Sequence, residues 1–293
     1  MKQNPLGVIL TVALTFGAIH VLRNGVSSDS YLYLPALLLL PFIVGPLAIF
    51  LTVRTPSRPA IEAVPISNPS IPPEHRETIE ALTQSLLGLG FEQVGTDFFR
   101  CSDPKKHAAG TIAILQHPET SDMASIIGFK DGGLLGFARN RSDGTRIRTG
   151  FSTMRNTTPP HPADDVLRIR GFCKPDWLWA LHSVRVENDP LRAKNPSPVD
   201  AFSYQIHEEL DGINNFIRCG YWTPMSSNER QLRVTVRGAI MSALRLMTPT
   251  AQIFDSLDRL KLKEILKKTG CPTEQEYRRS TRNSAPNSVA RAR

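Results

Sequence analysis

The residues of this sequence that could do chemistry are mainly its four cysteines and seven histidines. Cys173 stands just before a helix expected over residues 176–186, and the N-terminus of a helix stabilises a thiolate. His161 or His182 could then act as the base that activates this thiol. No local protease signature surrounds Cys173, and cysteine is among the most buried residue types. A hydrolase-type enzyme with a Cys173 nucleophile is therefore kept as an alternative to a chain without catalysis.

Other common chemistries lack the residues that they need. No histidine stands four residues from another and no C-x-x-C occurs, so we expect no metal site and no cofactor. The stretch Gly150–Met154 lacks the closing glycine of a nucleophile elbow. The glycines of 128–136 lack the Gly-Lys-Ser/Thr of a phosphate loop, and hairpin turns explain them.

Candidate binding residues lie in two expected strands and one helix. Arg146, Arg148, Arg168 and Arg170 alternate with apolar residues, so each pair faces one side of its strand. If the two strands are neighbours, the four arginines could form an anion-binding stripe; otherwise they form a solvated sheet face. In the helix that follows, Trp177 points to the core, whereas Trp179 could lie at a contact surface.

An α+β fold is expected to position these residues. The apolar spacing predicts a helix over 74–89. Period-two patterns with Gly-containing turns then predict six short strands: 91–101, 111–117, 123–130, 134–140, 146–153 and 166–172. Their close spacing, without crossover helices, favours an antiparallel meander sheet flanked by helices.

The period returns to 3.6 residues after the sheet. Helices are expected over 176–186, 202–217, 232–247 and 251–268. In the last of these, Ile253, Leu257, Leu260 and Ile265 are expected to face inward. The helix over 232–247 carries Arg233, Arg237 and Arg245 along an apolar body, so it could lie on a bilayer surface or be buried with an arginine rim.

Two long apolar runs precede this domain. Leu6–Leu22 and Tyr31–Val53 span 17 and 23 residues, or about 25 and 34 Å as helices, against a hydrocarbon core of about 30 Å. A short polar segment joins them, so a transmembrane helical hairpin is expected. The alternative for the first run is a cleaved signal peptide, although no convincing cleavage site follows it.

These patterns divide the chain into four parts. Residues 1–54 form a two-helix membrane anchor, 55–73 a Pro-rich linker, 74–270 a soluble α+β domain and 271–293 a disordered basic tail. Lys2, Arg54 and Arg58 flank the runs, whereas the turn holds only Arg23, which favours N-in/C-in topology with a cytoplasmic domain. The four cysteines show no paired spacing and could stay reduced there.

The net charge of +8 does not indicate a nucleic-acid partner. Residues 1–58 and 271–293 each carry a net charge of +3, and the 212 residues between them only +2. A duplex-binding domain concentrates Lys and Arg in its folded part. The expected partner is therefore the lipid bilayer, through residues 6–22 and 31–53, together with a protein partner that the sequence does not identify.

Three stretches together resemble uncharacterised bacterial membrane-anchored proteins with two N-terminal transmembrane helices. They are Leu86–Phe91, the hairpin Asp143-Gly144-Thr145 with Thr149, and the segment 232–249 with Thr235, Arg237-Gly238-Ala239 and Pro249. This resemblance implies a bacterial inner-membrane location and no particular activity. The sequence thus predicts a non-enzymatic binding or interaction module at the inner face of that membrane. The alternatives are the Cys173 enzyme and a peripheral lipid-contacting domain.

Overall fold

A computed structural model describes most of the chain from residue 42 onward. The described residues are 42–57, 61–65, 68–69, 71–94, 97–101, 111–129, 132–153, 164–191, 201–225, 228–246 and 250–284. The expected first apolar run, Leu6–Leu22, lies outside them, as do His161 and residues 31–41 of the expected second run. None of the described helices is both long and apolar enough to cross a membrane.

The chain divides into two compact units. Unit 1 combines Met1–Arg58 with Ile213–Ala251, and unit 2 combines Pro59–Gly212 with Gln252–Arg293. The expected division at residues 54 and 74 therefore differs from the observed one, because 39 residues of the expected soluble domain group with the N-terminal segment. Contacts between distant strands, which no local pattern reveals, cause the difference.

Unit 2 is built on a mixed sheet of eight strands, ordered β2-β4-β5-β6-β7-β8-β9, with β3 paired to β5. The strands are β2 (Ile61–Pro65), β3 (Glu92–Gln93), β4 (Asp97–Cys101), β5 (Thr111–Gln116), β6 (Met123–Phe129), β7 (Gly132–Asn140), β8 (Arg146–Ser152) and β9 (Asp165–Arg170). The antiparallel meander that the sequence predicts is present from β4 to β8. The expectation is wrong for β9, which runs parallel to β8. A parallel pair needs a crossover instead of a tight turn, and the chain between Ser152 and Asp165 is long enough for one.

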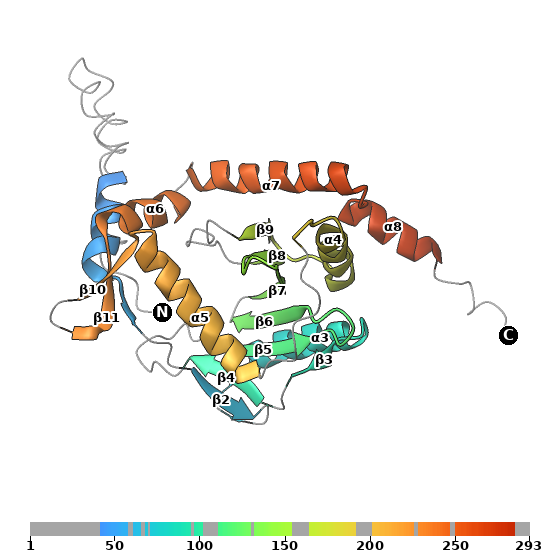
Figure 1. The fold of residues 1–293 in the computed structure, drawn as a ribbon, viewed down its shortest axis with the longest axis horizontal. Helices are drawn as coiled ribbons and strands as arrows, with labels where there is room; N and C mark the ends of the chain where they lie inside the picture. Colours follow the sequence, from blue (N-terminus) through green and yellow to red (C-terminus); the bar gives the residue numbers. More distant parts are fainter. Residues whose placement is uncertain are drawn as a thin grey trace, which may run out of the picture. The chain divides into compact units, whose positions relative to one another are not determined.

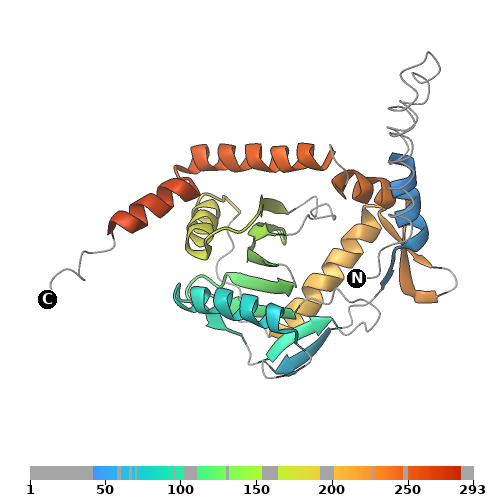
Figure 2. The ribbon, with the colours of Figure 1, turned by 180° about the vertical axis from the view of Figure 1, so that it is seen from behind.

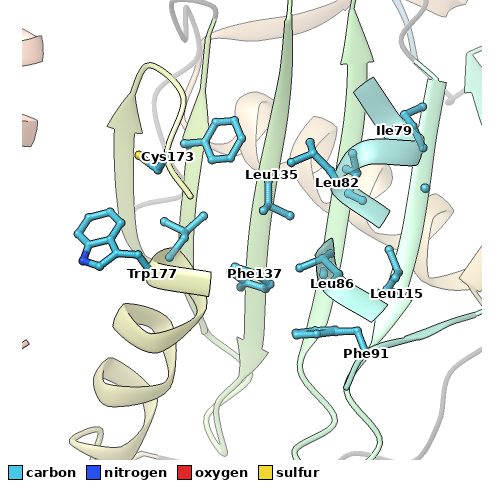
Figure 3. Close-up of a cluster of buried hydrophobic side chains, with 14 of the residues drawn as sticks. Ile79, Leu82, Leu86, Phe91, Leu115, Leu135, Phe137, Cys173 and Trp177 are labelled. Carbon is cyan, nitrogen blue, oxygen red and sulfur yellow. The ribbon is translucent and has the colours of Figure 1, made fainter. Parts of the chain in front are cut away.

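One face of this sheet holds the main core. Helices α3 (Pro73–Leu87) and α4 (Pro175–Glu187) cover it side by side. In Figure 3, Leu82 and Leu86 of α3 lie next to Leu135 and Phe137 of β7, and Trp177 of α4 lies on the Cys173 side of the same cluster. Strand β7 alternates half-buried and buried residues from Gly132 to Arg139. The sequence predicts this alternation and the buried position of Trp177.

Glycines let α3 approach the sheet closely. Gly128 and Gly133 are cross-strand partners in β6 and β7. A Cβ on Gly128 would lie 2.7 Å from the backbone oxygen of His75, and one on Gly133 would lie 2.8 Å from Thr78 Cγ2. The sequence interpretation assigned these glycines to turns. Only Gly132, with φ of 144°, needs the conformational freedom of a turn glycine.

The opposite face of the sheet is covered in part by α5 (Ala201–Arg218). Tyr204 of α5 packs on Ile112, Ile114 and Met123, which form a second, smaller apolar cluster. Figures 1 and 2, seen from opposite sides, show α3 on one face and α5 on the other. The boundary between the two units falls inside α5, after Gly212.

Helix α7 (Thr250–Thr269) protects the free edge of the sheet. Lys261 donates to the backbone oxygen of Val166 at 2.8 Å and to Asp165 Oδ1 at 3.0 Å. Strand β9 is the last strand in the order, and a charged lysine at an unpaired edge discourages pairing with another chain. Farther along α7, Leu262, Ile265 and Leu266 pack against the core.

Three expectations for the C-terminal half need correction. Residues 228–234 form strand β11, so the helix expected over 232–247 is the shorter α6 (Val236–Leu246). The expected inward residues Ile253, Leu257 and Leu260 of α7 are 57%, 53% and 60% exposed. Within the expected disordered tail, residues Glu274–Ser284 form helix α8, and Trp177 Nε1 donates to the backbone oxygen of Pro272 at 2.9 Å.

Unit 1 contains a helix over residues 42–52, a three-stranded sheet and α6. The sheet has the order β1-β11-β10, with β1 (Arg54–Pro56), β10 (Trp222–Met225) and β11 (Asn228–Val234). β1 follows the 42–52 helix after one residue, and β2 of unit 2 lies only a few residues later. The Pro-rich segment 55–73, which the sequence predicts to be an extended spacer, thus contributes strands to both sheets. Its prolines do not prevent this, because β1 and β2 each pair with one strand among the described residues and lie at the edges of their sheets.

Candidate functional site

The most highly organised set of ionisable residues lies under α4, at one end of the main core. Asp122 precedes β6, and Arg139 lies on the buried side of β7. Arg139 Nε and Nη2 donate to the two carboxylate oxygens of Asp122 at 2.6 and 2.7 Å. Both side chains are only 2% exposed. This two-pronged geometry is the strongest form of an arginine–carboxylate pair.

Helix α4 adds His182 to the pair and connects it to β8. His182 Nε2 lies 3.4 Å from Asp122 Oδ1, and His182 Nδ1 lies 3.0 Å from Thr149 Oγ1. Because the carboxylate of Asp122 can only accept, Nε2 carries the hydrogen and Nδ1 accepts one from the Thr149 hydroxyl. We refer to Asp122, Arg139, Thr149, His182 and Arg185 as the α4 network.

Arg185 completes the α4 network one turn along the helix. It donates to Thr149 Oγ1 and, at 2.7 Å, to the backbone oxygen of Arg148. Its Nη2 atom lies 2.9 Å from Asp165 Oδ2 on β9. Helix α4 is thereby joined by charged hydrogen bonds to β8 and β9 and, through His182, to Asp122 before β6.

Burial fixes the charge states within the α4 network. Burial tends to raise the pKa of Asp122, but hydrogen bonds from His182 and Arg139 outweigh it and lower this pKa to about 2. Burial lowers the pKa of His182 from its ordinary value, despite the nearby Asp122 carboxylate. The network therefore holds an ionised aspartate and a neutral histidine at neutral pH.

The order Thr149–His182–Asp122 resembles a nucleophile, a base and an orienting acid, but it is closed to substrate. Thr149 and His182 are 0% exposed and Asp122 is 2% exposed. A nucleophile must reach the atom that it attacks, and the Thr149 hydroxyl is already bonded to Arg185 and His182. The geometry indicates a structural network that holds α4 on the sheet.

Cys173 lies in the main core rather than in an open cleft. It is 3% exposed, and burial followed by the nearby Glu274 carboxylate raises the pKa of its thiol to about 12. A nucleophilic cysteine needs the opposite shift. His182, one of its two candidate bases, has both ring nitrogens directed to Thr149 and Asp122. The structure thus gives no support to the Cys173 enzyme.

The four candidate arginines do share one sheet face. In the parallel β8–β9 pair, Gly150 faces Arg168 and Ser152 faces Arg170. Gly150 and Ser152 have the same parity in β8 as Arg146 and Arg148, so Arg168 and Arg170 lie on the same face as those two arginines. Three of the four arginines already form ion pairs with carboxylates of this chain. Arg146 pairs with Glu208 and, at 2.6 Å, with Asp211.

The other pairs extend across the same face. Arg148 lies 2.9 Å from Glu208 and 3.2 Å from Asp164, and Arg170 pairs with Asp255 of α7. Arg168 also has an interaction partner. An external anion would have to displace these carboxylates. The arginines therefore join α5, Asp164 before β9 and α7 to this face of the sheet.

Trp179 is a half-buried member of an aromatic group. Its ring stacks on His117 with centroids 5.3 Å apart and meets Phe91 edge-on at 4.8 Å. Phe137 lies 5.3 Å away. Such aromatic pairs stabilise a core by more than the burial of their surface area alone. Trp179 therefore packs against other side chains of unit 2 on at least two sides.

Several residues of this site were not identified from the sequence. Arg139 carried a usable signal, since it has the same parity in β7 as the buried Leu135 and Phe137. A charged residue at a core-facing position implies a buried partner. Asp122 and Arg185 carried no comparable signal, because a turn and an amphipathic helix both accept surface charges.

Among the residues that the structure describes, no group of three or more His, Cys, Asp or Glu side chains could hold a metal ion. Comparison with protein-family models, with curated proteins and with solved structures gives no match for this chain.

Proposed function

We propose that this chain is an inner-membrane protein in which Leu6–Leu22 and Tyr31–Val53 anchor a non-enzymatic binding or interaction module. The observation that carries the proposal is the apolar surface of the 42–52 helix. Ile43, Leu47 and Leu51, spaced four residues apart, are 64%, 51% and 58% exposed. Such a stripe on an uncharged helix is favourable in hydrocarbon and costly in water.

The end of this helix also suits a membrane surface. Arg54 Nη1 donates to the backbone oxygens of Phe50 at 3.1 Å and Val53 at 2.9 Å. An arginine at this place satisfies carbonyls that the helix leaves free, and it can lie at the headgroup level. The described helix of 11 residues is about 16 Å long, so the preceding apolar residues must supply the rest of a span.

A binding role is favoured over catalysis by the state of the ionisable groups in unit 2. The α4 network and Cys173 are buried, and the arginines of β8 and β9 are paired. The surface of unit 2 does expose Ile253, Leu257 and Leu260 of α7. Surface contacts, rather than chemistry at these buried groups, are therefore the activity that we propose for this unit.

Extraction of bacterial membranes with alkaline carbonate tests the anchor. The full chain is expected to stay in the membrane pellet. A Leu14→Lys/Leu47→Lys variant places a charge in each apolar run, at a cost of about 3 kcal/mol per lysine at mid-membrane, and should shift to the supernatant. The control Leu257→Lys/Leu260→Lys changes two exposed leucines of α7 and should remain in the pellet. Release of the unchanged chain without detergent would overturn the anchor.

The expected N-in/C-in topology has its own test. A membrane-impermeant maleimide added to spheroplasts should not label Cys271, which is partly exposed on unit 2. Labelling should begin only after the spheroplasts are lysed. Labelling of Cys271 in sealed spheroplasts would place unit 2 on the periplasmic side.

A further inference from the structure

The register of the sheet in unit 1 brings the start of α6 to the place where the 42–52 helix ends. Arg54 is paired with Arg233, Thr55 with Leu232 and Pro56 with Gln231. Because this pairing is antiparallel, β1 leads away from residue 53 and β11 leads back toward it, so the C-terminal end of β11 lies near residue 53. α6 begins at Val236, two residues after β11 ends. If residue 53 lies at the membrane surface, the N-terminus of α6 lies there too.

α6 is firmly fixed to this sheet. The Thr235 hydroxyl accepts from Gly238 N at 3.1 Å and donates to the backbone oxygen of Gly220 at 2.6 Å, so it caps α6 and joins it to the turn before β10. A Cβ on Gly238 would lie 2.2 Å from the backbone oxygen of Tyr221. Only glycine permits so close an approach, and α6 is held in one place relative to β10.

The exposed side of α6 combines apolar and basic residues. Val236 and Ile240, one turn apart, are 61% and 43% exposed. Arg237 is also exposed, and its guanidinium lies 5.4 Å from the centre of the Tyr221 ring. Arg233 is exposed on β11, directly opposite Arg54. Two arginines paired across strands repel each other, and an anion near them would remove this repulsion.

The charge of the whole chain is concentrated in the same unit. Unit 1 contains nine Lys and Arg residues against two acidic residues, Asp29 and Glu229, a net charge of +7. The net charge of the chain is +8, so unit 2 is almost neutral. When the chain is divided only by sequence position, the excess positive charge appears at both termini, in residues 1–58 and 271–293. When the residues are grouped by unit, most of this charge instead falls in unit 1.

We propose that α6, together with Arg233 and Arg237, is a lipid-contact platform that binds the anionic headgroups of the bilayer. The proposal rests on the proposed anchor, which places the end of the 42–52 helix at the bilayer. Val236 and Ile240 enter the boundary between headgroups and acyl chains, and the two arginines contact lipid phosphates. An amphipathic helix with basic residues beside its apolar side has this mode of membrane binding.

Photocrosslinking of the full chain in vesicles tests the platform. A photoreactive benzoylphenylalanine replaces Ile240, or Gln231 as a control on β11, which is exposed and lies farther along the strand from the membrane end. In vesicles with equal amounts of phosphatidylcholine and phosphatidylglycerol, the probe at 240 should give lipid adducts several-fold above those of the control. The adducts should be enriched in phosphatidylglycerol.

The role of the two arginines in headgroup binding is tested separately. Arg233→Gln/Arg237→Gln should lower the ratio of phosphatidylglycerol to phosphatidylcholine adducts at position 240, by up to about fivefold per arginine. An unchanged ratio would overturn their role in headgroup binding. An adduct of position 240 with a second protein chain would show that α6 is a protein contact and would overturn the platform.

Failure of the platform and failure of the anchor give different results. A chain that resists carbonate but forms no lipid adduct at position 240 keeps the anchor and overturns the platform. A chain that carbonate releases, yet forms the adduct in vesicles, overturns the anchor and supports direct lipid binding by α6.

Discussion

Asp122 and Arg139 form a two-pronged ion pair, at 2.6 and 2.7 Å, that is almost completely removed from solvent. The pair joins the residue before β6 to the buried side of β7, and His182 connects it to α4. Taking two charges out of water is costly, and only close geometry and further hydrogen bonds offset that cost. Here His182 contacts the Asp122 carboxylate directly, and Thr149 and Arg185 connect to the pair only through His182. The α4 network thereby fixes α4 to three parts of unit 2.

The first prediction concerns the loss of one partner of this pair. Arg139→Met leaves the Asp122 charge buried without its guanidinium and should lower the free energy of unfolding of unit 2 by about 3–5 kcal/mol. The double variant Asp122→Leu/Arg139→Met leaves no buried charge and should be closer to wild type than Arg139→Met. Urea unfolding of the detergent-solubilised chain, followed by tryptophan fluorescence, measures both. A double variant less stable than Arg139→Met would contradict this account.

The second prediction concerns the pH dependence of stability. The folded-state pKa of His182 is lowered by burial, so below about pH 6.5 the unfolded chain binds a proton that the native chain does not bind. Stability is then present above pH 6.5 and is lost as the pH falls, with a slope of up to about 1.4 kcal/mol per pH unit. Asp122, with its pKa lowered to about 2, adds a second loss from its ordinary value of 3.8 down to about 2.

His182→Gln isolates the contribution of the histidine. Glutamine can hydrogen-bond to Thr149 or Asp122 but does not titrate. Its variant should therefore show a shallower dependence of unfolding free energy on pH between 5 and 6.5, whatever its absolute stability. His75, whose pKa burial also lowers, remains in both proteins and cancels in the comparison. Equal slopes for the two proteins would show that His182 is not buried in its neutral form.

The third prediction concerns the contact between α3 and the sheet. Gly128→Ala places a Cβ 2.7 Å from the backbone oxygen of His75 and 3.1 Å from Ile79. Because backbone atoms cannot move aside easily, the substitution should destabilise unit 2 by about 1–3 kcal/mol. Gly212 of α5 has open space at its Cβ position, so Gly212→Ala should be neutral or stabilising by up to about 1 kcal/mol. Thermal unfolding of the two variants side by side tests the contrast.

Local patterns predicted most elements of unit 2 between residues 74 and 270, but they missed β2 and α8 and whatever depends on distant contacts. The alternation in residues 132–140 identifies β7 and its buried side, because a strand with one buried face imposes a period of two. The parallel β8–β9 pair could not be predicted, since strand direction depends on the path of the connection. The strand β11 was missed because Leu232 and Val234 fit both the helical period and the strand period.

The candidate site was predicted less well than the fold. Spacing placed Arg146, Arg148, Arg168 and Arg170 on strands, and the structure shows that they share a face. Their partners Glu208, Asp211 and Asp255 lie about 60 to 85 residues later, and no periodic signal connects residues so far apart. The exposed side of α7 was misassigned for a related reason. An amphipathic pattern shows that a helix has an apolar side, not that something in the same chain covers it.

The last prediction concerns the reactivity of Cys173. With Cys173 only 3% exposed and the pKa of its thiol raised to about 12, almost none of this cysteine is thiolate at pH 8. Iodoacetamide should therefore modify Cys219, which is partly exposed, well before Cys173 in the native chain, and it should modify Cys173 only after unfolding in urea. Mass spectrometry of the digested protein measures the two rates. Rapid native alkylation of Cys173 would restore the thiol-enzyme hypothesis, because it would show both access to the sulfur and a thiolate that burial does not permit.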